Sequence, residues 1–210
     1  MRFAELDAVT VDGYGTLLTL VDPVPALRRA LADQGAERTD EQVSSAFAVE
    51  AAYYRPHAHL GRDEKTLAEL RRDCTAIFLE AVGVDVSAVS FAPSFVGALR
   101  FAPVPGAVET LELLRAHGLP LAVVANWDCA LRGHLAALGL DRLFATVVTS
   151  AEAGVPKPDP APFLLALERL GVEPGRALHV GDEPADELGA RAAGMRFTPA
   201  PLARAFEGWT

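Results

Sequence analysis

The 210-residue sequence has few cysteines and few lysines: Cys74, Cys129, Lys65 and Lys157 are all it contains. Two cysteines are too few for the disulfide framework that stabilises many small secreted proteins. No uninterrupted apolar run is long enough to cross a bilayer, and the first residues include acids where a signal peptide would be basic. These features predict a cytoplasmic protein with no membrane partner.

Basic residues are also in the minority. The 19 Lys and Arg residues are outnumbered by 28 Asp and Glu residues, which gives a formal net charge of −9. Such a charge disfavours non-specific binding to nucleic acid, so any attraction for an anion must be local. The hydrophobic fraction of 50% is enough for a sizeable buried core. We therefore expect no nucleic-acid partner. A monomer or a homodimer is the expected assembly.

A strand-like run, Ala8–Val11, leads into Asp12 and the glycine-rich segment Gly13–Leu18. Continuous apolar sequence is typical of a parallel strand buried on both faces, and functional groups gather just beyond the carboxyl ends of such strands. A glycine-rich turn lets backbone N–H groups approach an anion. An acid at this position is a candidate nucleophile or metal ligand. Taken alone, the segment is also compatible with an ordinary turn.

Three further strand-like runs end in polar residues. They lead, in order, to Asn126, to Lys157 within Gly154–Pro160, and to the acids Asp182 and Asp186. Prolines on both sides of Lys157 fix backbone φ and stiffen the segment that carries the amine. Since the carboxyl ends of parallel strands meet at one edge of a sheet, the four segments predict a single site.

In this order, the acid, the amide, the lysine and the acid pair resemble the four motifs of the haloacid dehalogenase-like (HAD) hydrolase superfamily. The resemblance runs from Asp12 through Gly194. It implies an α/β fold with a Rossmann-like three-layer core around a parallel sheet. It also implies an α-helical cap domain inserted after the first motif, as in one branch of the family.

The resemblance assigns Asp12 as the nucleophile of a phosphohydrolase that forms an aspartyl-phosphate from small phosphate monoesters. Asp12, the backbone carbonyl of Tyr14 and Asp182 would then hold Mg²⁺, which prefers hard oxygen ligands. Lys157 would balance negative charge during catalysis. Phosphoryl transfer depends mainly on such positioning and on cations, so the assignment is chemically coherent.

Four further roles follow from the same resemblance. Thr16, Asn126 and Lys157 would bind the phosphorylated substrate. Asp186 would lie behind the metal ligands and orient Lys157 or a metal-bound water.

Two positions depart from the family pattern. Most phosphatases of the family carry an aspartate two residues after the nucleophile, where it protonates the leaving group, but this chain has Tyr14. A phenol is a poor substitute because it is far less acidic than a carboxyl group. Ala125 replaces the hydroxyl residue of the second motif, and losing a preorganised donor of this kind costs roughly 2.7–4 kcal/mol of transition-state stabilisation. We expect slow turnover.

Two alternatives stay open. Family members with dehalogenase activity carry tyrosine at the position of Tyr14, which favours a 2-haloacid dehalogenase. Asp182 and Asp186 favour the metal-dependent phosphohydrolase, and Phe163 lacks the hydroxyl that a dehalogenase would have there. The second alternative is a non-catalytic binding or regulatory protein, since Tyr14 and Ala125 together weaken the expected chemistry.

Hydrophobic periodicity predicts the domain organisation. Residues 1–16 and 100–210 are expected to form the core and residues 17–99 the helical cap. Apolar residues at spacings of three and four predict cap helices at 24–34, 40–54, 64–82 and 86–97. From residue 107 onward, helices and strands alternate, which predicts a parallel sheet with right-handed crossovers. Those helices are expected at 107–117, 130–138, 161–170 and 185–193, and the strands at 119–125, 145–149, 177–180 and 196–199.

Overall fold

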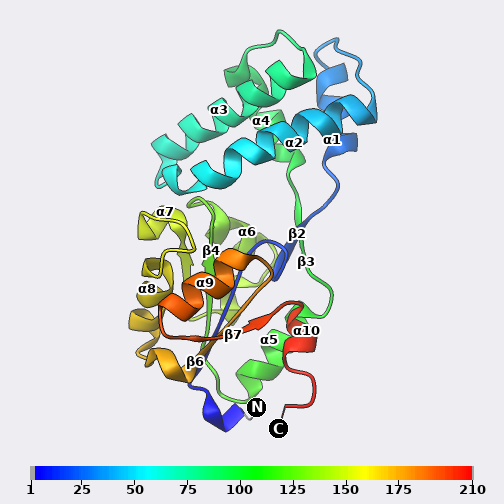
Figure 1. Ribbon diagram of the computed structural model, residues 1–210. Coiled ribbons are helices and arrows are strands. Elements are labelled where there is room, and N and C mark those ends of the chain that lie inside the picture. Colours follow the sequence, from blue (N-terminus) through cyan, green and yellow to red (C-terminus); the bar gives the residue numbers. More distant parts are fainter. Residues whose placement is uncertain (1–2, 210) are drawn as a thin grey trace. The chain divides into compact units, whose positions relative to one another are not determined.

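The computed structural model describes residues 3–209 and contains a five-stranded parallel sheet (Figure 1). Its strands lie in the order β5-β4-β1-β6-β7. Their bounds are Ala8–Val11 (β1), Leu121–Ala125 (β4), Thr146–Thr149 (β5), Ala177–Gly181 (β6) and Arg196–Pro199 (β7). The predicted α/β class with a Rossmann-like parallel sheet is confirmed.

Burial explains why the strands read as continuous apolar sequence. Every residue of β1, β4, β5 and β6 is buried, as expected for strands covered on both faces. The edge strand β7 is partly exposed along its length. The central strand β1 pairs with β4 through Val9 and Leu121 and with β6 through Thr10 and His179.

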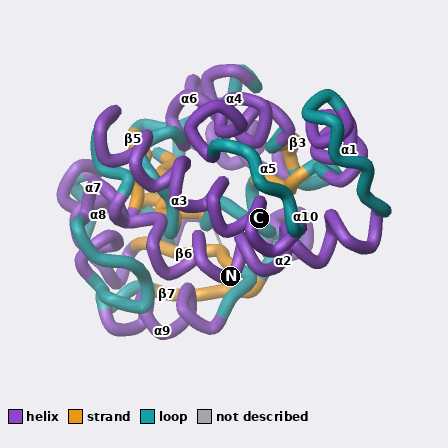
Figure 2. The backbone as a smooth tube through the Cα atoms, turned by 90° about the horizontal axis from the view of Figure 1, so that it is seen from above, coloured by secondary structure: helices purple, strands orange, loops and turns teal. Residues whose placement is uncertain are grey.

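Helices cover both faces of the sheet. Strand order and right-handed crossovers place α5 (Ala107–Ala116) and α6 (Leu131–Ala137) on one face. The same rule places α8 (Ala161–Leu170) and α9 (Pro184–Ala192) on the other, and Figure 2 shows α9 and α5 on opposite sides of the strands. Apolar residues of α8 and α9 pack against β1, β4 and β6 in one buried cluster around Phe163.

Residues 1–19 and 102–210 form one compact unit, the core unit, and residues 20–101 form a second, the helical unit. Two short strands, β2 (Leu18–Leu20) and β3 (Phe101–Pro103), pair with each other where the chain passes between the units. Neither strand is among the predicted elements, because three residues carry too little periodicity to distinguish a strand from a loop.

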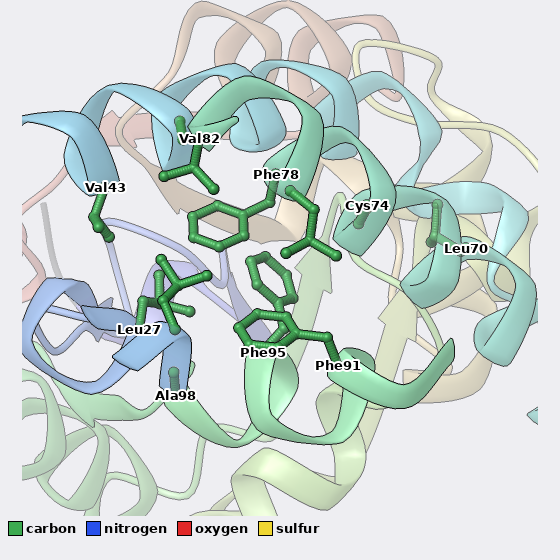
Figure 3. Packing of buried hydrophobic residues seen from close by; sticks show 12 residues of the cluster. Leu27, Val43, Leu70, Cys74, Phe78, Val82, Phe91, Phe95 and Ala98 are labelled. Atoms are coloured by element: carbon green, nitrogen blue, oxygen red, sulfur yellow. The ribbon is translucent and has the colours of Figure 1, made fainter. Parts of the chain in front are cut away.

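The helical unit contains four helices. They are α1 (Val24–Ala32), α2 (Asp40–His57), α3 (Glu64–Val82) and α4 (Ala88–Ala98). A buried cluster holds them together, with the stacked and tilted rings of Phe78, Phe91 and Phe95 at its centre (Figure 3). Rings that pack in this way bury much apolar surface per residue, so a short helical segment can form its own core.

Capping boxes fix the first turns of the two long helices. At the start of α2, the Thr39 hydroxyl accepts from the backbone N–H of Gln42, and the backbone N–H of Thr39 donates to the Gln42 side chain. Asp63 and Thr66 form the same pair of bonds at the start of α3. Such pairs satisfy backbone N–H groups that have no partner within the helix.

The predicted helices agree closely with the observed ones, except at some ends. The helix predicted at 64–82 has the observed bounds of α3, whereas α2 extends three residues beyond the predicted 40–54. Two short helices were not predicted, α7 (Ser150–Ala153) and α10 (Leu202–Ala205), since four residues do not complete a periodic pattern. Among residues 3–209, no helix is both long and apolar enough to cross a membrane.

Candidate active site

The predicted site residues follow the carboxyl ends of four neighbouring strands of the core unit. Asp12 directly follows β1, Asn126 follows β4, Lys157 lies in the segment after β5 and α7, and Asp182 follows β6. The chain leaves β1 towards β4 on one side, while β6 flanks β1 on the other. This arrangement produces a topological switch point, where open α/β sheets bind their ligands.

Lys157 lies at the centre of the site and is only 6% exposed. Its Nζ donates to Asp12 Oδ1 at 2.5 Å, to Asp186 Oδ1 at 2.5 Å and to the backbone oxygen of Val124 at 3.0 Å. An ammonium group has three N–H donors, so each one has a partner. The predicted role of Asp186 in orienting Lys157 is consistent with this contact.

Asn126 holds the backbone of the lysine segment. Its Nδ2 donates to the backbone oxygen of Lys157 at 3.1 Å, and its Oδ1 accepts from the backbone N–H of Lys157 at 2.7 Å. Both ends of the amide are therefore engaged within the protein. For the predicted substrate contact, the backbone N–H of Asn126 is a better candidate than its side chain.

The glycine-rich turn brings Asp182 next to the loop after β1. Gly15 has φ of 90°, and a Cβ at this residue would collide with the Asp182 carboxylate. The positive φ favours glycine here, and any side chain at this residue would displace the Asp182 carboxylate. The hydroxyl of Thr16 is fully buried and donates to Asp182 Oδ1 at 3.0 Å. In this structure Thr16, which we predicted to bind substrate, holds a carboxylate in place.

Three carboxylates gather around the lysine. Asp12, Asp182 and Asp186 each offer one oxygen, and these oxygens lie within 4.8 Å of one another. Asp186 is the least available of the three, because Oδ1 accepts from Lys157 and Oδ2 accepts from the backbone N–H of Glu183 at 3.0 Å. Asp12 accepts from Lys157 and from the backbone N–H of Gly13, and Asp182 accepts from Thr16 through Oδ1. The donor set suits a hard divalent cation such as Mg²⁺.

Burial and charge shift the ionisation of these groups in opposite directions. Burial raises the pKa of Asp12 to about 7, with Lys157 opposing the shift and Asp186 adding to it. Burial would also raise the pKa of Asp186, but His179 and Lys157 hold it well below its usual range. For Lys157, burial is outweighed by the two carboxylates, so its pKa is raised. The amine therefore stays charged at neutral pH.

His179, a residue that the sequence analysis missed, lies behind the site. It is fully buried in β6, with Nδ1 2.8 Å from Thr10 Oγ1 and Nε2 3.3 Å from Asp186 Oδ1. Burial lowers its pKa to about 4, so the ring is neutral at pH 7. The sequence signal for a functional His179 was a polar residue inside an apolar strand. Its pairing with Thr10 could not be predicted, because it depends on the register of β1 and β6.

The two departures from the family pattern differ in exposure. The Tyr14 side chain is 46% exposed, whereas Ala125 is buried at the end of β4. The methyl group of Ala125 faces Gly13, where an added Cβ would approach it to 2.9 Å. The residue that lacks the second-motif hydroxyl, Ala125, thus packs closely against the backbone at Gly13.

A family model for haloacid dehalogenase-like hydrolases matches residues 6–194 of the chain. The chain belongs to this family. The predicted family membership and hydrolase class are thereby confirmed. The matched range includes every residue of the site described above, so the HAD-like hydrolase assignment and the geometry concern the same part of the molecule.

Two relatives show how far this HAD-like hydrolase resembles named proteins. The human haloacid dehalogenase-like hydrolase domain-containing protein 3 is 50% identical over 91 residues, which cover 43% of this chain and 36% of that protein. A phosphoserine phosphatase from Thermus thermophilus is 40% identical over 120 residues, covering 56% of this chain and 48% of the phosphatase. The matches thus span between about a third and a half of these curated relatives.

Among solved structures, a 2-haloacid dehalogenase from Pseudomonas syringae pv. Tomato DC3000 is similar over most of the molecule. It superimposes with a TM-score of 0.64 and 31% sequence identity, and the match covers 91% of this chain and 85% of the dehalogenase. The proteins similar to this chain thus include one named as a phosphatase, at 40% identity over 120 residues, and one named as a dehalogenase, at 31% identity.

Proposed function

We propose that this HAD-like hydrolase is a phosphohydrolase that removes phosphate from small phosphate monoesters. The observation that carries the proposal is the position of Asp12. Its carboxylate lies beyond the carboxyl edge of the sheet. It accepts a hydrogen bond from Lys157 and belongs to a cluster of three acids. Phosphoryl transfer needs an anionic nucleophile, a fixed cation and oxygen ligands for a metal, and these groups supply all three.

In the first step, Asp12 attacks the phosphorus of the substrate. A bond forms between its carboxylate oxygen and phosphorus as the bond to the leaving oxygen breaks, which gives an aspartyl-phosphate and an alkoxide or phenolate that takes its proton from water. In the second step, water attacks the phosphorus, and Asp12 is regenerated as inorganic phosphate leaves. Lys157 stays ionised throughout and holds charge beside the reacting carboxylate.

Asp12, Asp182 and the backbone carbonyl of Tyr14 are the proposed ligands for Mg²⁺. When bound, the ion supplies positive charge opposite the phosphate oxygens. Thr16 supports this arrangement by fixing Asp182, and Asn126 supports it by fixing the backbone of Lys157. The chain's own cation, Lys157, cannot neutralise three carboxylates and a phosphate, so the charge balance also favours a bound divalent ion.

The helical unit is proposed to serve as the cap, which selects the substrate and excludes bulk water during the reaction. Its four helices have their own apolar cluster and so can act as one body. Which small phosphorylated molecule is accepted would then depend on residues between 20 and 101.

The test is phosphate release from an activated aryl phosphate, measured with Mg²⁺ and with a chelator. We expect release that depends on the metal and falls at least roughly 10³-fold in Asp12→Asn, since the nucleophile is lost. Asp141→Asn, which changes an exposed acid of the core unit, should match the unsubstituted protein. Addition of Mg²⁺ should raise the melting temperature of the protein but not that of Asp182→Asn. Metal-independent release, or full activity in Asp12→Asn, would refute the proposal.

Tyr14 predicts which substrates react well. Because no carboxyl group stands at this position, we expect aryl phosphates, whose leaving groups need little protonation, to react faster than alkyl phosphates. Tyr14→Asp should raise the rate with alkyl phosphates and narrow the difference between the two classes. An unchanged rate with alkyl phosphates would count against this explanation, and Tyr14→Phe is the matched control that adds no acid.

Halide release from 2-haloacids is the second candidate function. Tyr14 and the similarity to the dehalogenase structure favour it. The acid cluster disfavours it. A carboxylate that displaces a halide needs no metal ion, because the substrate carries no phosphate group whose charge must be neutralised. Phe163 is fully buried with its ring edge against His179, so it offers no hydroxyl to a leaving halide.

A halide-release assay on 2-haloacids separates the two functions in the same preparation. Metal-independent halide release that is lost in Asp12→Asn would establish the dehalogenase and displace the phosphohydrolase. If neither phosphate nor halide is released, a non-catalytic binding role on the same fold gains support.

A further inference from the structure

A chain of buried polar groups runs from the middle of the sheet to the proposed nucleophile. It consists of Thr10, His179, Asp186, Lys157 and Asp12, joined in that order by hydrogen bonds. The first three are at most 1% exposed. Burying a polar group costs free energy unless it is hydrogen-bonded. A buried network of five hydrogen-bonded side chains therefore calls for an explanation beyond packing.

The protonation of the His179 ring follows from its partners. The Asp186 carboxylate only accepts hydrogen bonds, so Nε2 of His179 must carry the proton that points at Oδ1. Nδ1 then has a lone pair and accepts from the hydroxyl of Thr10 at 2.8 Å. The register of the parallel pair β1 and β6 places Thr10 beside His179. The sheet itself therefore selects one tautomer of the ring.

We propose that His179 is a positioning residue for Lys157, acting through Asp186. By donating to Oδ1, His179 fixes the carboxylate that holds the Lys157 amine beside Asp12. Asp186 accepts from three groups, Lys157, His179 and the backbone of Glu183, which together define its orientation. When a phosphate approaches, the contact between Lys157 and Asp12 must adjust, and the contact with Asp186 keeps the amine in place.

The inference rests on the proposed phosphohydrolase activity, because that reaction gives Lys157 its role. It predicts a specific kinetic pattern. His179→Leu removes the donor to Asp186 and should lower kcat by about tenfold or more, with KM changed less than threefold, since a hydrogen bond to a charged group is lost in the transition state. His179→Gln keeps an N–H at the end of the side chain and should recover most of kcat.

A matched control separates positioning from packing. Phe163 is fully buried and its ring meets the His179 ring edge-on, with centroids 4.9 Å apart. Phe163→Leu should lower the melting temperature as His179→Leu does, yet leave kcat within about threefold, because it disturbs packing without removing a donor. Equal losses of kcat in Phe163→Leu and His179→Leu, or no recovery in His179→Gln, would overturn the proposal.

A readout that needs no substrate keeps the inference distinct from the proposed function. Nitrogen-15 NMR of the imidazole should show a neutral ring with the proton on Nε2, and Thr10→Val should shift the Nδ1 resonance by removing its donor. If this tautomer is found in a protein that releases no phosphate, the proposed function fails and the buried hydrogen-bond chain stands. A proton on Nδ1 in an active enzyme would refute the positioning role alone.

Discussion

The core unit and the helical unit both bury ionisable side chains, but they treat them differently. In the core unit, Asp12 and Asp186 share the ammonium group of Lys157. In the helical unit, Glu50 is 4% exposed and lies beside the thiol of Cys74, and within residues 3–209 no cation bonds to it. Burial is tolerated in the first case by pairing and in the second by protonation. The comparison shows that the candidate site holds buried acids in charged pairs, whereas the helical unit holds its buried acid in the neutral form.

The largest effect should come from breaking the paired charges. Lys157→Met leaves Asp12 and Asp186 without their cation, and removing one partner from a buried ion pair costs roughly 3–5 kcal/mol of unfolding free energy. Phosphate release should disappear in the same variant. Chemical denaturation at pH 7.5 measures the loss of stability.

A compensating variant sharpens this test. Lys157→Met combined with Asp186→Asn removes one negative charge along with the cation and should regain part of the lost stability without regaining activity. If Lys157→Met alone were as stable as the parent protein, the paired charges would contribute nothing to folding.

The next effect concerns the unpaired acid of the helical unit. Burial raises the pKa of Glu50 from 4.5 to about 7, so the folded state binds its proton more tightly than the unfolded state does. The contribution of Glu50 to stability therefore falls as the pH rises from about 4.5 to about 7, and this contribution is constant above that range. Glu50→Gln removes this dependence and should stabilise the protein at pH 8 by at most roughly 3 kcal/mol.

The pH 4 measurement is the internal control for Glu50→Gln. At that pH the carboxyl is mostly protonated in both states, so the variant and the parent should unfold at nearly the same denaturant concentration. A constant difference between the two proteins from pH 4 to pH 8 would mean that charge is not the cause.

The smallest effect tests the local order of the helical unit. Thr39→Ala removes the side chain that accepts from Gln42 at the start of α2 and should cost about 1 kcal/mol of unfolding free energy. Ser44→Ala, an exposed change within the same helix, should leave stability unchanged or slightly higher. Equal losses in the two variants would show that the capping box contributes little.

Sequence reasoning recovered the parts of the fold that rest on local patterns. Helix α3, with its apolar residues three and four apart and a capping acid before it, was predicted at its observed bounds. Strand β1 was also recovered, because four buried positions give a continuous apolar run. The strand β2 was not predicted because it is defined by its pairing with the distant β3, and the helix α7 was not predicted because four residues do not complete a periodic pattern.

The sequence predicted which residues of the candidate site lie near one another, but not how they contact each other. The sequence placed Asp12, Lys157 and Asp186 in one site, yet it could not show that a single amine bridges both acids. It also gave no sign that Asn126 holds the lysine backbone or that Thr10 and His179 extend the chain of hydrogen bonds. These facts depend on strand register and on side-chain direction, which one sequence does not encode in any local pattern.

The complete hydrogen bonding of the buried Lys157 amine has a practical consequence for chemical labelling. All three of its N–H donors are engaged and the side chain is nearly inaccessible, so amine-reactive dyes should not attach there. Lys65, the other lysine of the chain, is exposed in the first turn of α3. Of the two lysines, a dye ester would therefore label only Lys65 on the helical unit and leave the site intact, which allows a fluorophore to be attached through a lysine without a substitution.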